Sequence, residues 1–327
     1  MTRTAGLEAA VNGEGAHAPV LGLDIGGTKL AAGVIDDGGV VHSFAVAPTP
    51  ATNGPQPALD TLFELGRQAI AEGGLEVQAI GIGSGGPLDA ERGVLIAPPH
   101  LRGWHDVPVV ELAEEAFDLP ASLENDATAA AAGEHRWGAG AGIRNMVYLT
   151  ISTGVGGGVV IDGSLYRGSM GNGGELGHVT IDWHGRRCKG CGRRGCLEAY
   201  VSGTSIAERA SEAGLELTSA EAVAAAARDG HPGASAVWDE TVEALACGLT
   251  SIVNLFEPEL VVLGGGVTRS GDQLLRPVRE IVHASSMQPA GSAVDIVLSP
   301  FGDQVGVVGA AAIVYERVGL GDVRPNG

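Results

Sequence analysis

Residues 173–198 read GGELGHVTIDWHGRRCKGCGRRGCLE and place carboxylates, an imidazole and three thiols in one short segment. Two residues separate Cys188 from Cys191, and four separate Cys191 from Cys196. Clustered cysteines with a preceding histidine can close a tetrahedral zinc site, with His178 or His184 as the fourth ligand. The alternative is three unligated thiols in a glycine-rich loop. We favour a structural Zn²⁺, because free clustered thiols would be reactive and would leave the loop without support.

Composition restricts the classes of protein that this chain can represent. Its 327 residues are enough for two domains, and 44% of them are hydrophobic, which is typical of a globular protein. No apolar run has the length of a membrane span, and residues 1–19 lack the apolar core of a signal peptide. We therefore expect a disordered N-terminal tail, a cytoplasmic protein and no membrane partner. The formal net charge of −19 argues against nucleic acid as a partner.

Strand-like and helix-like patterns alternate along the chain and predict an α/β fold. Each half opens on an apolar strand followed by a glycine turn, which suggests a duplicated architecture with a cleft between two domains. We place the boundary near Glu124, between a small α/β domain at 20–124 and a larger one at 125–304 that carries the zinc segment. Strands are expected at 20–25, 30–35, 40–47, 79–82, 122–124, 146–151, 158–161, 259–263 and 294–298. Helices are expected at 58–71, 109–117, 127–137, 206–213, 219–228, 234–256, 273–284 and 305–317.

Three glycine-rich turns follow apolar strands, at Gly26–Gly27, Gly154–Gly158 and Gly264–Gly266. Glycine lets backbone N–H groups approach phosphate oxygens closely. Asp24, at the end of the first strand, can hold Mg²⁺ through water, as phosphoryl transfer requires. None of the turns matches the Walker or dinucleotide pattern, and each alone is weak evidence. Together, we interpret them as phosphate-binding turns, to which Thr28 and Thr153 add hydroxyl donors and Lys29 a positive charge.

Asn125-Asp126 precedes an alanine-rich run that predicts a helix. Asp126 stands where the N-cap of that helix is expected, so capping is one interpretation of this carboxylate. The other is that it accepts a proton from a substrate hydroxyl. Both remain open at the level of the residue pattern.

In this combination the motifs resemble those of the ROK family, named for repressors, open reading frames and kinases. The resemblance covers Leu21 to Arg317 and is most specific from Thr150 to Glu198, which contains STGVGGG, GELGH and CGRRGCLE in that order. It implies a two-domain actin-like (ribonuclease H-like) sugar kinase fold that closes over ATP and a hexose in an interdomain cleft. It also implies that residues 305–327 return to the small domain as a C-terminal helix, and that the protein is a homo-oligomer, either a dimer or a tetramer.

The resemblance implies a role for each matching residue. ATP is bound by Asp24, Gly26, Gly27, Thr28, Lys29, Thr153, Gly154, Gly264, Gly265 and Gly266, together with catalytic Mg²⁺. The sugar is bound by Gly86, Asn125, Asp126, Glu175, His178 and Glu198, with Asp126 as general base for the 6-hydroxyl. The structural Zn²⁺ is held by His178, Cys188, Cys191 and Cys196. His178 then uses one ring nitrogen on the metal and the other on the sugar.

Two positions depart from the family pattern. The family commonly has one residue between its first two cysteines, whereas Cys188 and Cys191 are separated by two. The turn Ser84–Pro87 replaces the more usual Pro-Gly-Pro. These departures leave the identity of the first zinc ligand and the shape of the sugar-side loop open.

The resulting expectation is ATP-dependent phosphorylation of a hexose, glucose first, at its 6-hydroxyl. A kinase for an amino or N-acyl sugar, such as N-acetylmannosamine, N-acetylglucosamine or a 3-amino-glucose, is the alternative, because the motifs do not reveal the groups that face C2 and C3. A sugar-responsive repressor is less favoured. Such a repressor needs a helix-turn-helix domain before the first phosphate turn, and residues 1–19 are too few to form one.

Overall fold

A computed structural model describes residues 7, 18–51 and 54–318, and these residues form two compact units. The first contains the chain up to Gly142, the segment Arg167–Gly171 and the residues from Asp303 onward. The second contains Ile143–Tyr166 and Asn172–Gly302. Within the described residues, no helix is long and apolar enough to cross a membrane.

The first unit is built on a five-stranded sheet with the order β3-β2-β1-β4-β7. Its strands are β1 (Val20–Ile25), β2 (Lys29–Ile35), β3 (Val41–Pro48), β4 (Ala79–Ser84) and β7 (Ala121–Asn125). Strands β1, β2 and β3 are antiparallel neighbours, whereas β1, β4 and β7 run parallel. The register aligns Ile25 with Ser84 and Ser84 with Asn125, so these three strands end at one edge of the sheet.

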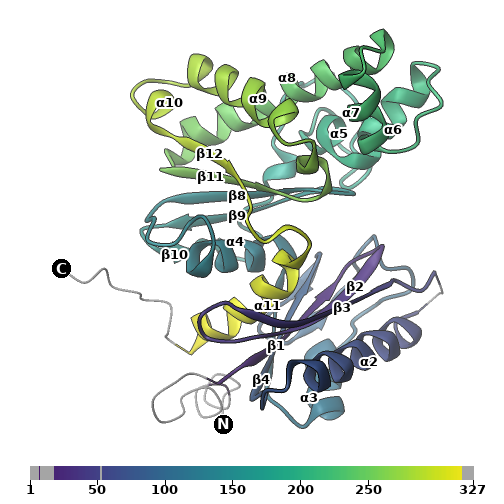
Figure 1. Cartoon of the computed structure of the whole chain (residues 1–327), viewed down its shortest axis with the longest axis vertical. Coiled ribbons are helices and arrows are strands. Elements are labelled where there is room, and N and C mark those ends of the chain that lie inside the picture. The colour runs from purple at the N-terminus through teal and green to yellow at the C-terminus, as the bar shows by residue number, and fades with distance from the viewer. Residues whose placement is uncertain (1–6, 8–17, 52–53, 319–327) are drawn as a thin grey trace. The chain divides into compact units, whose positions relative to one another are not determined.

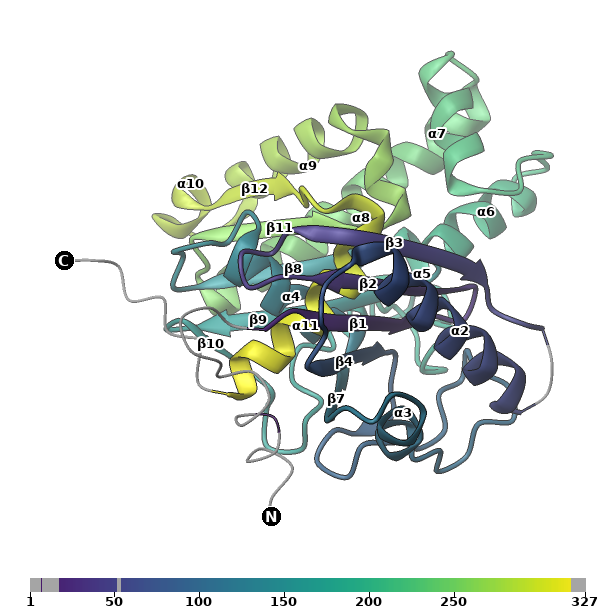
Figure 2. The same cartoon turned by 60° about the horizontal axis from the view of Figure 1, so that its bottom comes forward.

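Helices cover both faces of this sheet (Figures 1 and 2). On one face, α2 (Gln56–Gly73) and α3 (Val109–Phe117) share a core with Leu21 and Leu23 of β1. On the other face, the alternate residue Gly22 lies against the backbone of α11 (Val305–Arg317), which also packs on α4 (Asp126–Trp137). A short hairpin of β5 (Leu88–Asp89) and β6 (Val94–Leu95) follows β4. The period of two along β1 thus assigns each face its own helices.

The second unit repeats this strand pattern in the order β10-β9-β8-β11-β12. Its strands are β8 (Met146–Ile151), β9 (Val155–Ile161), β10 (Ser164–Leu165), β11 (Leu260–Gly264) and β12 (Asp295–Leu298). The first three are antiparallel neighbours, and β8, β11 and β12 are parallel. Each sheet therefore has its first glycine turn between its first two strands, at Gly26–Thr28 and at Ser152–Gly154.

Helices from the second half of the chain pack on β8 and β11 around a core that includes Leu149 and Leu263. They are α5 (Glu198–Val201), α6 (Gly203–Glu212), α7 (Ala220–Arg228), α8 (Pro232–Phe256), α9 (Asp272–Ser285) and α10 (Ala290–Ala293). Short 3₁₀ turns lie at η1 (Leu176–His178), η2 (Gly266–Ser270) and η3 (Gly302–Gln304). Cys188, Cys196 and Leu197 of the cysteine segment belong to the same core, so the metal-binding segment is anchored to the body of the unit.

Two expectations, one on a strand and one on the domain boundary, differ from the structure. The strand expected at 158–161 begins at Val155, so Gly156 and Gly157 lie in β9, where a side chain on Gly157 would collide with Leu176. The first unit extends to Gly142, beyond the expected boundary at Glu124, because α4 packs on α11. The expected disordered tail falls almost entirely outside the described residues. The elements expected at 20–25, 109–117, 146–151 and 305–317 have these same bounds in the structure.

Candidate active site and metal centre

One edge of the first sheet collects the polar residues that follow β1, β4 and β7. Because these parallel strands end in register, the turns Gly26–Thr28 and Gly85–Gly86 and the pair Asn125-Asp126 come to the same edge. The carboxyl ends of parallel strands are the usual position of ligand sites in α/β proteins.

The first glycine turn has a closed backbone geometry. Gly26 donates its N–H to the carbonyl of Lys29 at 3.0 Å, and the Thr49 hydroxyl donates to the Gly26 carbonyl at 2.6 Å. A methyl group on Gly26 would lie 2.7 Å from the Lys29 carbonyl oxygen. Alanine therefore does not fit at Gly26 without a backbone shift.

Asp24 is an acidic residue of this edge, as is Asp126. It lies on the face of β1 that α11 covers, with its carboxylate against the backbone of Gly306 in the first turn of that helix. Burial, together with the negative charge of Asp126, raises the pKa of Asp24 to about 7, although Lys29 opposes the shift. A cation bound nearby would stabilise the ionised form of this carboxylate.

Asn125 and Asp126 have separate tasks at the start of α4. The Asn125 side-chain oxygen accepts from the N–H groups of Ala127 at 3.0 Å and Thr128 at 3.2 Å, so Asn125 is the N-cap. The interpretation of Asp126 as the cap is therefore wrong. One oxygen of Asp126 accepts from the Ala127 N–H at 2.8 Å, and burial raises the pKa of this carboxyl. A carboxylate with a raised pKa is better matched to accepting a proton near neutral pH.

A partly buried ionic network lies next to Asn125 and Asp126. Glu124 is buried in β7, and one of its oxygens accepts from the Asn125 N–H at 3.0 Å. The other accepts from Arg167 Nε at 2.7 Å. Arg167 also donates two hydrogen bonds to Glu316 of α11, at 3.1 and 2.5 Å. A glutamate inside an expected strand was the signal for this network, and the motif analysis did not include it.

The second unit has its own pair of glycine turns. The turn at Ser152–Gly154 closes through a hydrogen bond from the Ser152 N–H to the Gly154 carbonyl at 2.9 Å. The Thr204 hydroxyl at the start of α6 donates to the Thr153 carbonyl at 2.9 Å. Gly265 has a positive φ of 89° and lies so close to Ile151 that a methyl group would stand 2.4 Å from its carbonyl oxygen. Gly264–Gly266 is thereby held beside the end of β8, next to the first turn of its sheet.

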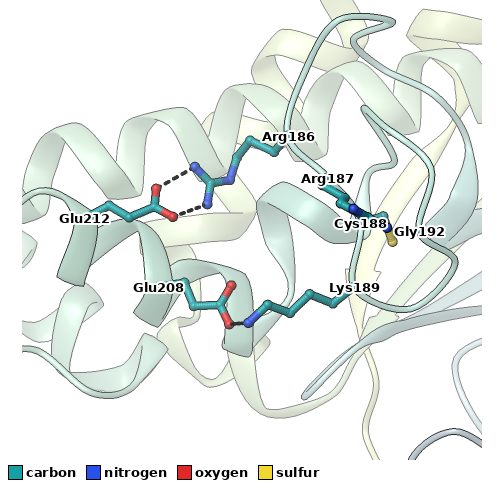
Figure 3. Close-up of a pocket in the computed structure, with 7 residues that line it drawn as sticks. All are labelled: Arg186, Arg187, Cys188, Lys189, Gly192, Glu208 and Glu212. Atoms are coloured by element: carbon teal, nitrogen blue, oxygen red, sulfur yellow. Dashed lines mark hydrogen bonds and ion pairs between the residues drawn. The ribbon is translucent and has the colours of Figure 1, made fainter.

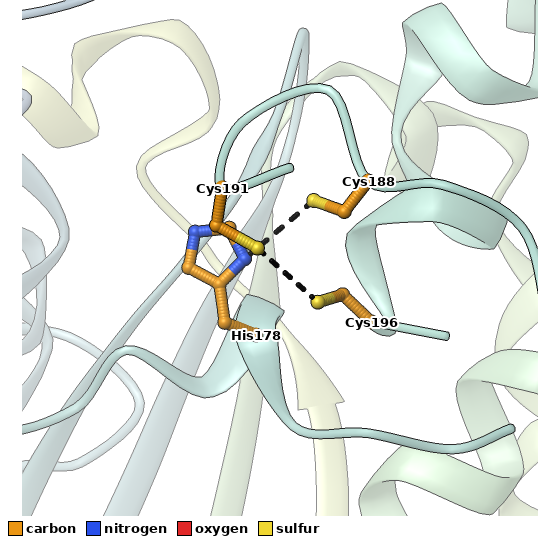
Figure 4. Close-up of side chains that lie close together, drawn as sticks. All are labelled: His178, Cys188, Cys191 and Cys196. Atoms are coloured by element: carbon orange, nitrogen blue, oxygen red, sulfur yellow. Dashed lines mark hydrogen bonds between the residues drawn. The ribbon is translucent and has the colours of Figure 1, made fainter. Parts of the chain in front are cut away.

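His178 and the three clustered cysteines meet in this unit (Figure 4). All four ligand atoms lie within 4.8 Å of one another. The Cys191 and Cys196 sulfurs are 3.5 Å apart, and Cys188 Sγ is 3.7 Å from His178 Nδ1. Around a zinc ion with bonds of about 2.3 Å to sulfur and about 2.0 Å to nitrogen, a tetrahedron has edges of about 3.5–3.8 Å. The four residues therefore fit a zinc ion, whereas His184 is exposed and lies outside the group.

The rest of the segment holds these ligands in place. Cys188 donates its N–H to the Arg193 carbonyl at 2.8 Å, and Gly192 donates to the Cys188 carbonyl at 2.9 Å. On the outer side of the loop, Arg186 pairs with Glu212 of α6 and Lys189 pairs with Glu208 of the same helix (Figure 3). Both acidic residues that line the pocket between these side chains are therefore already paired with a cation of the loop. We therefore interpret the two ion pairs as contacts that hold the loop against α6.

The residues expected to bind the sugar in this unit lie around His178 and the three cysteines, which we call the metal group. His178 turns Nδ1 towards the thiols, which leaves Nε2 for another partner. One oxygen of Glu198 accepts from the Val155 N–H at 3.0 Å, beside Gly154, and the other lies 3.2 Å from Cys188 Sγ. Glu175 is exposed at the start of η1. Glu198 therefore connects the metal segment to the glycine turn of the second sheet.

Comparison with known proteins places this chain. Residues 20–317 match the ROK family. The chain belongs to the ROK family. The resemblance drawn from the motifs is confirmed, and so is the expected α/β fold with two five-stranded sheets.

Several similar ROK proteins are sugar kinases by name, and one similar solved structure, with a TM-score of 0.80 and 28% identity, is a ROK family transcriptional regulator. A glucokinase from Thermotoga maritima is 36% identical over 316 residues, which cover 92% of this chain and 98% of the relative. An N-acetylmannosamine kinase from Citrobacter koseri is 34% identical over 293 residues, covering 90% and 97%. The crystal structure of a ROK glucokinase from Streptomyces griseus in complex with glucose and AMPPNP has a TM-score of 0.79 and 32% identity, covering 91% of this chain and 99% of that one.

One residue of the first edge escaped the motif analysis entirely. His100 lies in the loop between β6 and α3 and contacts both Gly27 and Gly85. Nothing in the local pattern Pro98-Pro99-His100 marks it, because the contact joins segments that are far apart in the sequence.

Proposed function

We propose that this ROK-family sugar kinase transfers the γ-phosphoryl group of ATP to the 6-hydroxyl of a hexose, with glucose as the first candidate. The observation that carries the proposal is Asp126, a partly buried carboxylate with a raised pKa. It stands at the same sheet edge as Asp24 and the first glycine turn. The glucokinase relatives support glucose as the acceptor.

Each residue of the first edge has a distinct task in this reaction. Asp126 accepts the proton of the 6-hydroxyl as the sugar oxygen forms its bond to the γ-phosphorus and the bond to the ADP oxygen breaks. Asn125, whose side-chain oxygen is occupied by the cap, offers its amide nitrogen to a sugar hydroxyl. The turn Gly26–Thr28 and Lys29 bind phosphate oxygens. Bound Mg²⁺ would neutralise charge on the phosphates, and Asp24 would hold it through water.

The second unit contributes its own binding groups. We assign Thr153 and Gly154 to the phosphates and Gly264–Gly266 to the nucleoside. We assign Glu175, His178 Nε2 and Glu198 to the remaining sugar hydroxyls. Zn²⁺ at the Cys188, Cys191 and Cys196 thiols would act structurally, by fixing the tautomer and direction of the His178 ring.

A kinase for an N-acyl sugar is the second candidate. An N-acetylmannosamine kinase matches this chain at 34% identity, close to the 36% of a glucokinase, and this similarity supports the second candidate. Both reactions use the same 6-hydroxyl chemistry and differ only in the group at C2.

A coupled ADP-release assay with MgATP tests the proposal. The purified chain should release ADP only in the presence of an acceptor, and the panel should contain glucose, mannose, N-acetylmannosamine, N-acetylglucosamine and 3-amino-glucose. Glucose should give the highest kcat/KM. A higher value for an N-acyl sugar would select the second candidate, and no stimulation by any acceptor would refute the kinase assignment.

A further inference from the structure

His100 is exposed to solvent as a residue, and one side of it lies against two glycine turns of the first unit. A methyl group on Gly85 would lie 2.5 Å from His100 Cε1, and one on Gly27 would lie 2.9 Å from His100 Cβ. Neither glycine has a positive φ, so the backbone conformation does not demand glycine at these positions. Glycine is needed there because His100 fills the space that a side chain would occupy. One side chain therefore touches both the proposed phosphate turn and the proposed sugar-side loop.

The Asp126 carboxylate is a charged group that acts on this ring. Asp126 faces it from the start of α4, and β1 and β2 contribute Asp24 and Lys29 at the same edge. The turn Ser84–Pro87 has no charged residue. Partial burial lowers the pKa of His100 and the Asp126 carboxylate opposes that shift; reciprocally, His100 lowers the raised pKa of Asp126. The ring and the carboxylate are thus electrostatically coupled.

We propose that His100 is a further positioning residue of the kinase site, wedged between the phosphate turn and the sugar-side loop beside Asp126. It holds the two turns at the spacing that transfer requires, and it stabilises the ionised form of the base. The inference rests on the proposed function. It goes beyond it by assigning a role to a residue outside the family motifs.

The test compares His100→Ala and His100→Asn with His105→Ala. His105 is an equally exposed histidine of the same loop that is not among the atoms nearest to Gly27 or Gly85, and His105→Ala should match the parent. A misplaced reacting group commonly costs tenfold or more in rate, so kcat/KM for the preferred sugar should fall about tenfold or more in His100→Ala. The acid limb of the kcat/KM–pH profile should move to higher pH in both His100 variants. The reason is that the group that lowers the Asp126 pKa has been removed.

A second readout does not depend on activity. With the histidine Cε1 positions labelled, NMR titration of the full chain should show a lower His100 pKa in Asp126→Asn than in the parent, because the carboxylate that favours the imidazolium is lost. An unchanged His100 pKa would overturn the inference. So would parent-like kcat/KM and an unmoved acid limb in His100→Ala. A parent enzyme that no sugar activates would instead refute the proposed function and, with it, the role of His100.

Discussion

At the start of α4, Asn125 caps the helix and Asp126 is the proposed general base. Asn125 satisfies two backbone N–H groups of the helix with its side-chain oxygen. Asp126 accepts from the Ala127 N–H with one oxygen and does not supply the cap. The cap therefore does not depend on the charge of Asp126, and variants of this residue can separate helix stability from catalysis.

The first prediction concerns Asp126→Asn. The change removes the proton acceptor and keeps both the size of the side chain and the Asn125 cap. General-base catalysis contributes roughly 10²- to 10⁴-fold in rate, so kcat should fall by about that factor. The melting temperature should stay within a few degrees of the parent value. Steady-state kinetics and a thermal melt decide the matter, and a variant that keeps more than about a tenth of the parent kcat would rule out the base role.

The second prediction concerns Asp24→Asn and pH. Asp24 has a pKa of about 7 in the folded protein, above its usual 3.8, so the folded state binds this proton more tightly than the unfolded chain. The stabilising contribution of the protonated form is complete below about pH 4 and is lost as the pH rises to about 7. Asparagine does not ionise, so the variant does not lose stability in this way as the pH rises. In magnesium-free buffer, Asp24→Asn should therefore exceed the parent in free energy of unfolding at pH 8, with the difference shrinking towards pH 4.

Urea denaturation at several pH values measures this difference. Asp60→Asn is a suitable control, because Asp60 is exposed on α2 and its removal relieves no buried charge. The same Asp24→Asn protein should be poorly active. A variant that is less stable than the parent at pH 8 would contradict the assignment of Asp24 as a partly buried carboxylate with a raised pKa.

At the scale of elements, α11 packs on the first sheet through a seam of glycines. Gly22 and Gly81 lie beneath Val307 and Ala310, and Gly133 of α4 faces Gly309. The absence of side chains lets the helix backbone approach the strands directly. Because Asp24 lies against Gly306 at the same interface, this close packing also places the first turn of α11 beside a carboxylate of the proposed site.

The third prediction tests this seam with two glycines of one strand. A methyl group on Gly81 would stand 1.8 Å from the Ala310 carbonyl oxygen, whereas the nearest atom to one on Gly83 is 3.8 Å away. Overpacking of this kind costs about 1–3 kcal/mol, so Gly81→Ala should lower the free energy of unfolding by at least that amount. Gly83→Ala should stay within about 0.5 kcal/mol of the parent. Equal effects of the two changes, measured by chemical denaturation, would show that the helix does not pack as described.

At the scale of the whole molecule, one architecture is used twice. Each unit has three antiparallel strands followed by two parallel ones, with a glycine turn after its first strand. The units differ in the segments that come later in each sheet. The first places Asn125-Asp126 at its sheet edge, and the second inserts the cysteine segment between β10 and α5. A cross-linking metal would compensate for the small amount of regular structure in that insertion.

The fourth prediction is that the protein carries about one zinc per chain. Metal analysis after purification without chelators should show it in the parent and in Cys247→Ser, since Cys247 lies on α8, outside the metal group. Cys191→Ser should lose most of the metal and several degrees of melting temperature. His178→Ala should lose the metal and His184→Ala should retain it. A parent protein without zinc would refute the assignment of a zinc site. Loss of the metal in His184→Ala and not in His178→Ala would make His184 the fourth ligand.

Local signals in the sequence determined most of the element order and the composition of the motifs. Apolar runs such as 20–25 and 146–151 are strands in the structure with unchanged bounds, because hydrophobic periodicity and turn residues act over a few positions. The ordered block from Thr150 to Glu198 was enough to indicate the family, since such a spacing of glycines, cysteines and acids is rarely met by chance.

Only the tertiary structure decided matters that depend on contacts between distant segments. It gave the cap to Asn125 instead of Asp126, brought His178 and not His184 to the thiols, and placed His100 between Gly27 and Gly85. It also kept α4 with the first unit through its packing on α11. These outcomes result from strand register, helix packing and the space around each side chain. No periodic pattern in a linear sequence records such contacts.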